Sequence, residues 1–267
     1  MVLLGNCMVF HVIRTEPILH KPMFYFLAML ALTDLSMGLS TVHTVLGILW
    51  RFTQEVRLDS CIAQSYFIHA LSLMESSVLL AMCFDRYIAI CNHLRYSSIL
   101  TGDKSMRISI AALGRSSLLI PPAIIRLKFL NYCCPHILSH SFCLHQDLLR
   151  MACSDIHFSS IYALALVIGT LLLDAVLILI SYGMILYTVL GVAFWEERVK
   201  SLKTSVSHIC AVLVFYVPII GLTMVHCFGK HLSPLVHIFM GNICILPAPL
   251  MNPINYSIKT KQIQKRI

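Results

Sequence analysis

The chain has 267 residues, of which 58% are hydrophobic and only 12% charged, and its mean hydropathy is +0.82. A soluble domain carries about a quarter charged residues, so this composition excludes one and requires lipid as the solvent. The formal charge of +8 is spread over short loops without a basic stripe, which excludes nucleic acid as a partner.

A helix needs roughly 20 apolar residues to cross the hydrocarbon core of a bilayer, which is about 30 Å thick. Six stretches are long enough, and they cover residues 22–49, 61–86, 106–125, 158–190, 206–228 and 235–257. A shorter apolar stretch over 2–13 comes first, a long loop covers 126–157, and 258–267 begins a tail helix. The alternating pattern of barrel strands is absent from the sequence. The sequence therefore predicts an all-α membrane protein, a single seven-transmembrane helical bundle over 1–267 with a truncated first helix.

Lys and Arg residues are divided unequally between the two sets of connections. Thirteen lie in one set, which includes Arg86 and Lys203, and six lie in the other, which includes Arg126 and Lys128. Because cytoplasmic loops hold an excess of Lys and Arg, the first set is expected to face the cytoplasm. This orientation puts the C-terminus inside the cell and the N-terminus outside.

Several cysteines lie on the predicted outer side of the membrane. Four of them are Cys61, Cys133, Cys143 and Cys153. Thiols in an oxidising compartment form disulfides, so these four predict two bridges, for which spacing alone allows three pairings. Cys134 and Cys227 are further thiols on that side, and we expect them to be free or buried.

Two carboxylates are predicted at the same depth in neighbouring helices. Asp34 lies about 18 Å from the inner end of its helix, and Glu75 lies about 16 Å from the inner end of the next one. Like charges in low dielectric cannot both stay bare, so the pair shares a proton or binds a cation. A sodium site is the preferred interpretation. The alternative is one protonated carboxyl that is hydrogen-bonded to nearby Ser and Thr residues.

A second pair of ionisable residues is predicted near mid-membrane. Arg115 and Asp174 lie in the helices 106–125 and 158–190. A charge inside the membrane is costly and normally finds a partner, so we expect an ion pair that holds the bundle together.

Two runs of residues resemble the signatures of rhodopsin-like G-protein-coupled receptors. Met-Cys-Phe-Asp-Arg-Tyr-Ile-Ala-Ile-Cys over 82–91 resembles the D-R-Y motif, and Pro-Leu-Met-Asn-Pro-Ile-Asn-Tyr over 249–256 resembles N-P-x-x-Y. The runs 19–27, 181–182 and 203–208 are similar to motifs peculiar to vertebrate odorant receptors. The runs 140–147 and 228–231 are similar to the class I, fish-like group of that family, subfamily fifty-one.

The resemblance implies disulfides Cys61–Cys143 and Cys133–Cys153, and it assigns roles at the inner end of the bundle. Arg86 is expected to meet the G protein on activation, with Asp85 holding it at rest. Tyr182 and Tyr256 are expected to turn inward toward it. The activation residues implied by the resemblance are Asp85, Arg86, Tyr87, Tyr182, His208, Asn252, Pro253 and Tyr256.

The resemblance also places a ligand pocket between the outer halves of the helices 61–86, 158–190 and 206–228, beneath the loop that carries Cys143. Its expected lining is His69, Leu73, Gln146, Ile220, Thr223 and Cys227. Relatives that recognise carboxylic acids carry Arg where this chain has Cys227, so we expect a weaker hold on a carboxylate. His69 and His226 remain as donors to a polar head group.

Two departures from the family pattern lie at the outer face, where Cys134 and Cys227 both stand in place of Arg. These residues either form a third disulfide or reflect mutational drift. The histidines predicted in the outer loops are His136, His140, His145, His157 and His231. Their spacing matches no defined Zn²⁺ or Cu²⁺ site, so we expect them to be solvated. Apart from the possible allosteric Na⁺, no cofactor or metal is expected.

The family implies an odorant receptor at the plasma membrane that binds a small volatile or weakly polar ligand. It implies activation of a heterotrimeric, stimulatory olfactory-type G protein that raises cAMP, and no nucleophile–base set suggests an enzyme. One alternative is a non-signalling pseudogene product or incomplete gene model retained in the endoplasmic reticulum. Met1 leads directly into a helix remnant, and the one Asn-x-Ser sequence, Asn255-Tyr256-Ser257, is predicted to be cytoplasmic. A transporter or channel is less favoured, since no inverted repeats are present.

Overall fold

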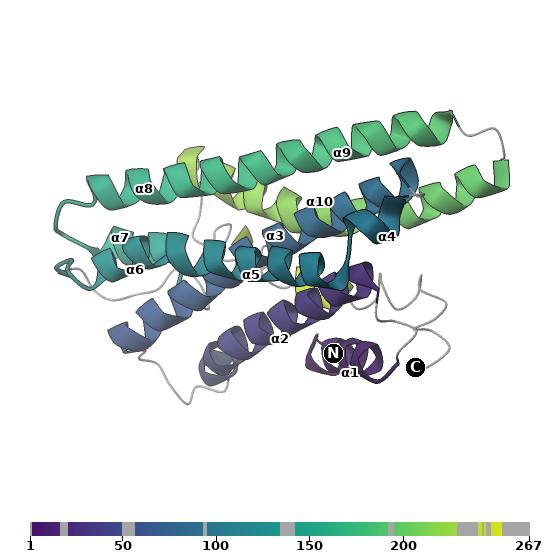
Figure 1. The fold of residues 1–267 in the computed structure, drawn as a ribbon. Helices are drawn as coiled ribbons and strands as arrows, with labels where there is room; N and C mark the ends of the chain where they lie inside the picture. Colours follow the sequence, from purple (N-terminus) through teal and green to yellow (C-terminus); the bar gives the residue numbers. More distant parts are fainter. Residues whose placement is uncertain are drawn as a thin grey trace.

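The computed structural model describes residues 2–16, 21–49, 57–92, 95–133, 142–191, 195–228, 240–241, 243 and 247–252. Within these ranges the chain is helical apart from short loops and an isolated antiparallel bridge between Tyr132 and Ala152. Figure 1 shows the long helices running side by side, with α3 in the middle of the bundle. The predicted all-α class is confirmed.

The helices are α1 (Val2–Thr15), α2 (Pro22–Leu49), α3 (Leu58–Cys91), α4 (Tyr96–Ile99), α5 (Gly102–Leu119), α6 (Pro121–Leu127), α7 (His145–Met151), α8 (His157–Val167), the π-helical segment η3 (Ile168–Leu172), α9 (Leu173–Leu190) and α10 (Trp195–Phe228). Five stretches of the described chain are long and apolar enough to cross a membrane: 22–42, 58–91, 102–127, 157–190 and 205–223. Most of the predicted seventh helix, 235–257, lies outside the described residues.

Several helices extend beyond the apolar stretches from which they were predicted. α3 continues to Cys91 past the predicted end at Arg86, and α10 begins at Trp195 well before the predicted start at residue 206. Apolar length marks only the part of a helix that lies in lipid, whereas backbone hydrogen bonds continue into the polar flanks. The sequence therefore located the membrane-crossing parts better than the helix ends.

The helices differ in how much of their surface other helices cover. α3 packs against α2, α5, α9 and α10, and most of its membrane-crossing residues are buried. The long α8–η3–α9 rod lies at the edge of the bundle (Figure 1) and leaves large apolar side chains such as Leu172 and Leu179 exposed. An apolar surface of this extent is expected to face lipid.

Two buried apolar clusters hold the bundle together. The larger one joins α1, α2, α3, α9 and α10 and includes Val9, Phe26, Leu30, Leu79, Met82, Ile178 and Phe215. The smaller one joins the start of α3 to α6 and α7 and includes Ile62, Leu73, Ile124, Leu127 and Leu148. We call the end of the bundle that carries the smaller cluster the disulfide end, and the opposite end the Arg86 end.

The helices bend where their backbone hydrogen-bond ladder is interrupted. Pro121 and Pro122 lack an N–H, so the ladder breaks at Ile120 between α5 and α6. The Tyr162 hydroxyl from α8 donates to the Leu119 carbonyl across this bend, at 3.1 Å. In η3 the Thr170 carbonyl accepts from Arg115 Nη2 at 3.3 Å. Neighbouring helices thus satisfy carbonyls at both irregular points, as a low-dielectric surrounding requires.

An ion pair lies at the centre of the bundle, as the sequence predicted. Arg115 Nη1 donates to Asp174 Oδ1 and Oδ2 at 3.0 and 2.9 Å, joining α5 to α9. Ser76 on α3 donates to Asp174 Oδ2 at 2.7 Å, and its hydroxyl also lies 2.8 Å from the Tyr216 hydroxyl on α10. These polar side chains connect four helices in one hydrogen-bonded network.

Replacement of Asp174 by Asn should destabilise the bundle, because the Arg115 guanidinium would keep its charge and lose its anion. We expect a loss of about 2 kcal/mol, measured as a thermal midpoint of the detergent-purified receptor lowered by roughly 5 °C. The matched control is Asp103→Asn, on an exposed residue of α5, which should change the midpoint by less than about 1 °C. Equal midpoints for Asp174→Asn and the parent would contradict a stabilising role for the pair.

Candidate functional site

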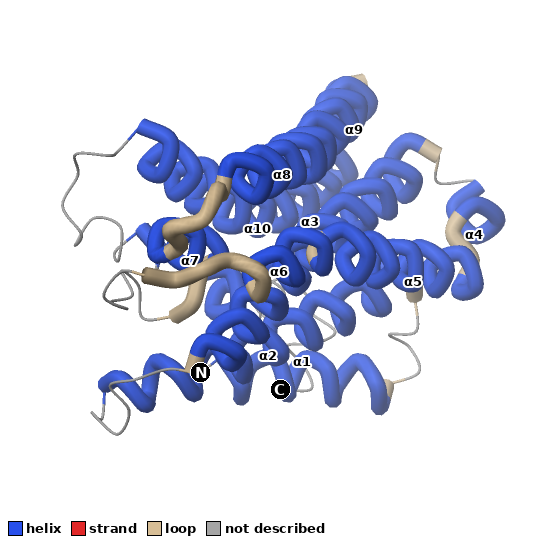
Figure 2. Tube along the Cα trace, turned by 90° about the vertical axis from the view of Figure 1, so that its left-hand side faces the viewer, coloured by secondary structure: helices blue, strands red, loops and turns tan. Residues whose placement is uncertain are grey.

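Two disulfides fix the loop that precedes α7. Cys61 at the start of α3 is bonded to Cys143 with a Cα–Cα distance of 5.2 Å, and Cys133 is bonded to Cys153 with a distance of 5.8 Å. These pairings are the ones that the family resemblance implied. Figure 2 shows the loop and α7 lying across one end of the bundle, near α6 and α8. A short helix is therefore tied covalently over the disulfide end.

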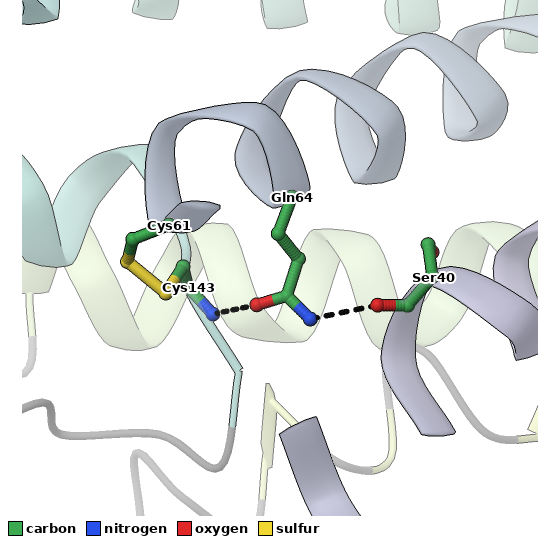
Figure 3. Close-up of a disulfide and its surroundings, with 4 residues drawn as sticks. All are labelled: Ser40, Cys61, Gln64 and Cys143. Atoms are coloured by element: carbon green, nitrogen blue, oxygen red, sulfur yellow. Dashed lines mark hydrogen bonds between the residues drawn. A yellow bond between two sulfur atoms is a disulfide. The ribbon is translucent and has the colours of Figure 1, made fainter. Parts of the chain in front are cut away.

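The Gln64 side chain fixes the same loop by hydrogen bonds (Figure 3). Its Oε1 accepts from the Cys143 backbone N–H at 2.9 Å, and its Nε2 donates to the Ser40 carbonyl of α2 at 2.8 Å. This residue was not among the sequence-predicted site residues. A glutamine one turn after a cysteine carries no distinctive signal in a single sequence.

Two histidines meet beneath this loop. His69 on α3 and His145 at the start of α7 have ring centroids 6.2 Å apart, with the rings nearly perpendicular. His69 Nε2 and both ring nitrogens of His145 are buried and make no hydrogen bond of standard geometry among the described residues, although the Ala123 backbone lies close enough to His145 to act on its pKa. Unpartnered buried donors and acceptors are costly, so they mark a place where a polar ligand atom would be stabilised.

His145 was expected to be a solvated loop histidine, and that expectation is wrong. Its side chain is 3% exposed because α7 folds back against α6 and α8. Burial lowers the pKa of His145 to about 4, with the Ala123 backbone opposing the shift. His145 is therefore neutral at pH 7. His157 is exposed as expected, and His136, His140 and His231 lie outside the described residues.

The remaining predicted pocket residues are only partly brought together. Leu73 is buried in the cluster at the disulfide end, and Gln146 is half-buried beside His145. The Thr223 hydroxyl donates to the Ile219 carbonyl of its own helix at 2.8 Å. Ile220 was expected to be an apolar wall, but its side chain is 53% exposed.

The exposure of Ile220 follows from the helical repeat of α10. Leu213, Val217 and Ile220 recur at the spacing of one helix face, and all three are more than half exposed. Ile220 thus belongs to the lipid-facing stripe, which corrects its assignment to the pocket. The side chains of His226 and Cys227 lie outside the described residues, as does Cys134, so the third disulfide considered above has no structural counterpart to describe.

Five of the predicted activation residues, Asp85, Arg86, Tyr87, Tyr182 and His208, lie at the Arg86 end. Asp85 is buried and accepts from the Tyr96 hydroxyl of α4 at 2.8 Å. Arg86 contacts the Met23 sulfur of α2, so the resting pair expected between Asp85 and Arg86 is not formed in this structure. Tyr96 of α4 is thus the hydrogen-bond partner of Asp85, and the sequence did not predict this contact.

A second contact at the Arg86 end joins α9 to α10. The Tyr182 hydroxyl is hydrogen-bonded to His208 Nδ1, and the two rings have centroids 5.8 Å apart. Tyr87 packs half-buried against the larger apolar cluster. Pro253 and Tyr256 lie outside the described residues. The two predicted activation residues Tyr182 and His208 are thus in direct contact.

The two mid-membrane carboxylates share one amide donor. Asn252 Nδ2 donates to Asp34 Oδ2 at 3.1 Å and to Glu75 Oε1 at 3.3 Å, so the two carboxylates lie close together, as their common depth predicted. All three side chains are at most 3% exposed, and Asp34 Oδ1 has no partner among the described residues. Sequence reasoning gave Asn252 a role in activation and missed this contact, because an amide carries no charge that would point to a partner.

Long apolar helices, a disulfide-anchored loop over buried polar side chains, and an Asp-Arg-Tyr run at the opposite end define a rhodopsin-like membrane receptor. The comparison with known sequences specifies the class further. A family model described as "Olfactory receptor" matches residues 1–267, and the chain belongs to that family. It is therefore a multi-pass membrane receptor of the seven-helix type, and not an enzyme.

Among the most similar proteins is human Olfactory receptor 51V1, which is 71% identical over 267 residues, covering all of this chain and 83% of the relative. Human Olfactory receptor 51G1 is 52% identical over 266 residues, again covering all of this chain and 83% of the relative. Human Olfactory receptor 51L1 is 51% identical over 98% of this chain and 83% of its own length. The resemblance to subfamily fifty-one is confirmed.

Acidification should destabilise the disulfide end through His145. Its folded-state pKa of about 4 lies below the ordinary 6.5, so between these values the unfolded chain binds a proton that the folded chain does not. Stability should therefore be highest above pH 6.5 and fall by up to about 3 kcal/mol as pH drops toward 4. The thermal midpoint of the purified receptor measures this slope, which should be shallower in His145→Asn and unchanged in the exposed-residue control His157→Asn. Parallel slopes in parent and His145→Asn would contradict the assignment.

Proposed function

We propose that this receptor binds a small volatile, weakly polar odorant at the disulfide end and activates a stimulatory, olfactory-type heterotrimeric G protein, raising cAMP. The observation that carries the proposal is the buried pair His69 and His145, whose unpartnered ring nitrogens lie beneath a loop anchored by Cys143. The names of the relatives, all olfactory receptors, support a ligand of this kind.

The chemistry of the pocket favours a ligand without a formal charge. His145 is neutral at pH 7, so it offers one hydrogen-bond donor and one acceptor and no cation. Gln146 and His69 add neutral polar groups, and Leu73 supplies apolar surface next to them. An alcohol or aldehyde would satisfy such groups while its hydrocarbon part packs against the apolar surface. A carboxylate would find no opposing charge among these side chains.

Transmission to the Arg86 end would use α10, which packs less extensively against α3 and α9 than these two helices pack against each other. Among the described residues, Tyr216 contacts Ser76 of α3 near mid-membrane, and His208 contacts Tyr182 of α9 at the Arg86 end. A helix attached by few contacts can take a second position at low energetic cost. Movement of α10 would then release Tyr182 and expose Arg86 to the G protein.

The proposal places the receptor in the plasma membrane with the disulfide end outside and the Arg86 end in the cytoplasm. The excess of Lys and Arg at the Arg86 end supports this orientation. The two disulfides support it as well, because disulfides persist on the oxidising side of the membrane.

The test is cAMP output in cells that display the receptor, measured across a panel of short acids, alcohols and aldehydes. The chain is assayed as printed and with a full first helix and glycosylated tail added to its start. A response to at least one ligand, lost in Arg86→Ala at equal surface expression, is the expected result. Silence of both versions despite good surface expression would contradict the proposal and favour a drifted, non-signalling receptor.

Replacement of Cys227 by Arg should strengthen the response to carboxylic acids. A guanidinium supplies the charge-assisted grip that the neutral pocket lacks, and we expect the concentration for half-maximal cAMP output to fall at least about tenfold. Alcohols of the same chain length serve as ligand controls and should gain nothing. Cys227→Lys should gain less, because an ammonium lacks the bidentate fork. Unchanged potency of acids in Cys227→Arg would count against the position of the pocket.

We further propose that Na⁺ binds between Asp34 and Glu75, where Asn252 and the unpartnered Asp34 Oδ1 supply oxygen and amide groups. A cation offsets two adjacent buried carboxylates in a way that one shared proton does only in part.

Replacing choline by Na⁺ at about 0.15 M should raise the thermal midpoint of the purified receptor. The free energy of unfolding should rise by about 1 kcal/mol if Na⁺ is present at a few times its dissociation constant. The gain should disappear in Asp34→Asn and persist in the exposed-residue control Asp103→Asn. A gain that persists in Asp34→Asn would show that Na⁺ acts elsewhere, and no gain in the parent would favour the protonated pair.

A further inference from the structure

The loop segment Phe142–Leu144 carries α7 and its pocket residues, so whatever holds this segment sets where His145 and Gln146 lie. The Cys61–Cys143 bridge fixes one point of it. Phe142 and Leu144, on either side of the bridge, are buried in an apolar cluster with Met37 of α2 and Ile68 of α3. A disulfide fixes the separation of two side chains and an apolar cluster has no preferred direction, so neither attachment alone sets where the Cys143 backbone N–H points.

The hydrogen bonds of Gln64 supply that direction (Figure 3). The Cys143 N–H is fully buried and points at Gln64 Oε1, while Gln64 Nε2 points at the Ser40 carbonyl. The arrangement needs an acceptor and a donor on one planar group, which among side chains of this length only the glutamine amide provides. The side chain is 8% exposed, so water competes little for either bond.

Three elements meet through this one side chain. Gln64 belongs to α3 and Ser40 to α2. Cys143 belongs to the loop that ends at Leu144, directly before α7. The amide therefore joins α2, α3 and the loop into one wall of the pocket.

We propose that Gln64 is a positioning residue for ligand recognition: its amide holds the loop before α7 against α2 and α3 and so sets the distance between His145 and His69. The inference rests on the proposed function, since it assigns recognition to the same pocket. Gln64 fixes the loop before α7 and does not itself contact the ligand. Its loss should therefore relax selectivity for ligand length more than it weakens binding of the ligand's polar head group.

The first arm of the test needs no ligand. The full chain in intact cells is treated with a membrane-impermeant phosphine reductant and an impermeant maleimide, and labelling of Cys143 and Cys153 is followed by peptide mass spectrometry. Gln64→Met should speed labelling of Cys143 roughly tenfold, because a buried N–H loses its acceptor and the loop opens more often. Labelling of Cys153, in the second bridge, should not change.

Gln64→Glu keeps the acceptor for Cys143 and loses the donor to Ser40, so its rate of Cys143 labelling should lie between those of the parent and Gln64→Met. Gln146→Met makes the same chemical change in α7, next to the loop, and should leave the labelling rate at the parental value. Equal rates of Cys143 labelling in the parent and Gln64→Met would contradict the proposal that the Gln64 amide holds the loop. A parallel rise of Cys153 labelling would overturn it as well, since that pattern reports general unfolding.

The second arm uses straight-chain alcohols and aldehydes of four to about ten carbons and records cAMP at matched surface expression. In Gln64→Met the dependence of potency on chain length should flatten, with long ligands gaining on short ones by at least about fivefold. Gln146→Met should weaken all lengths alike and keep their rank order.

Uniform weakening in Gln64→Met would reduce Gln64 to a purely structural residue and overturn the inference. A parent receptor that answers no ligand would overturn the proposed function and the recognition role with it. The Cys143 labelling rates would still show whether the Gln64 amide holds the loop. Failure of the proposed function and failure of the Gln64 proposal are therefore distinguishable.

Discussion

A polar side chain inside a bilayer has no water to satisfy it, and this constraint accounts for the Arg115–Asp174 ion pair. The carboxylate is almost completely buried and takes hydrogen bonds from Arg115 and Ser76, and Arg115 also donates to a carbonyl of the irregular segment η3. The α8–η3–α9 rod packs mainly against α3, and this network adds polar contacts from α3 and α5 to that packing. The same network extends through Ser76 to Tyr216, which joins α10 to the centre of the bundle.

The two ends of the bundle are built differently, and the difference fits a receptor. At the disulfide end a loop is held by two covalent bridges, by the Gln64 amide and by an apolar cluster. It lies over His69 and His145, whose buried ring nitrogens have no hydrogen bond of standard geometry within the described part of the chain. At the Arg86 end the helices meet through the larger apolar cluster and through individual hydrogen bonds, such as Tyr96 with Asp85 and Tyr182 with His208. A disulfide end fixed by covalent bridges and an opposite end joined by non-covalent contacts would allow a bound ligand to cause movement far from its site.

Single-sequence reasoning identified what depends on charge and length. The membrane-crossing segments, the Arg115–Asp174 pair and the common depth of Asp34 and Glu75 were predicted, because lipid penalises unpaired charge and short helices. It missed what depends on neutral groups and on tertiary packing. Asn252, Tyr96 and Gln64 are neutral, so nothing in their sequence surroundings distinguishes them. The burial of His145 depends on how α7 folds back, and the exposure of Ile220 depends on the rotation of α10, and neither can be read from a hydrophobic run.

The central claim is that a ligand bound at the disulfide end moves α10 relative to its neighbours at the Arg86 end. Spin labels on Met106→Cys of α5 and Val206→Cys of α10, both exposed at that end, would measure this movement in the purified receptor by electron–electron dipolar spectroscopy. The background would lack other reactive thiols, and the ligand would be one that raises cAMP in cells. The account predicts a longer distance between the two labels when ligand is bound. An unchanged distance in a receptor whose labelled form still answers the same ligand would contradict it.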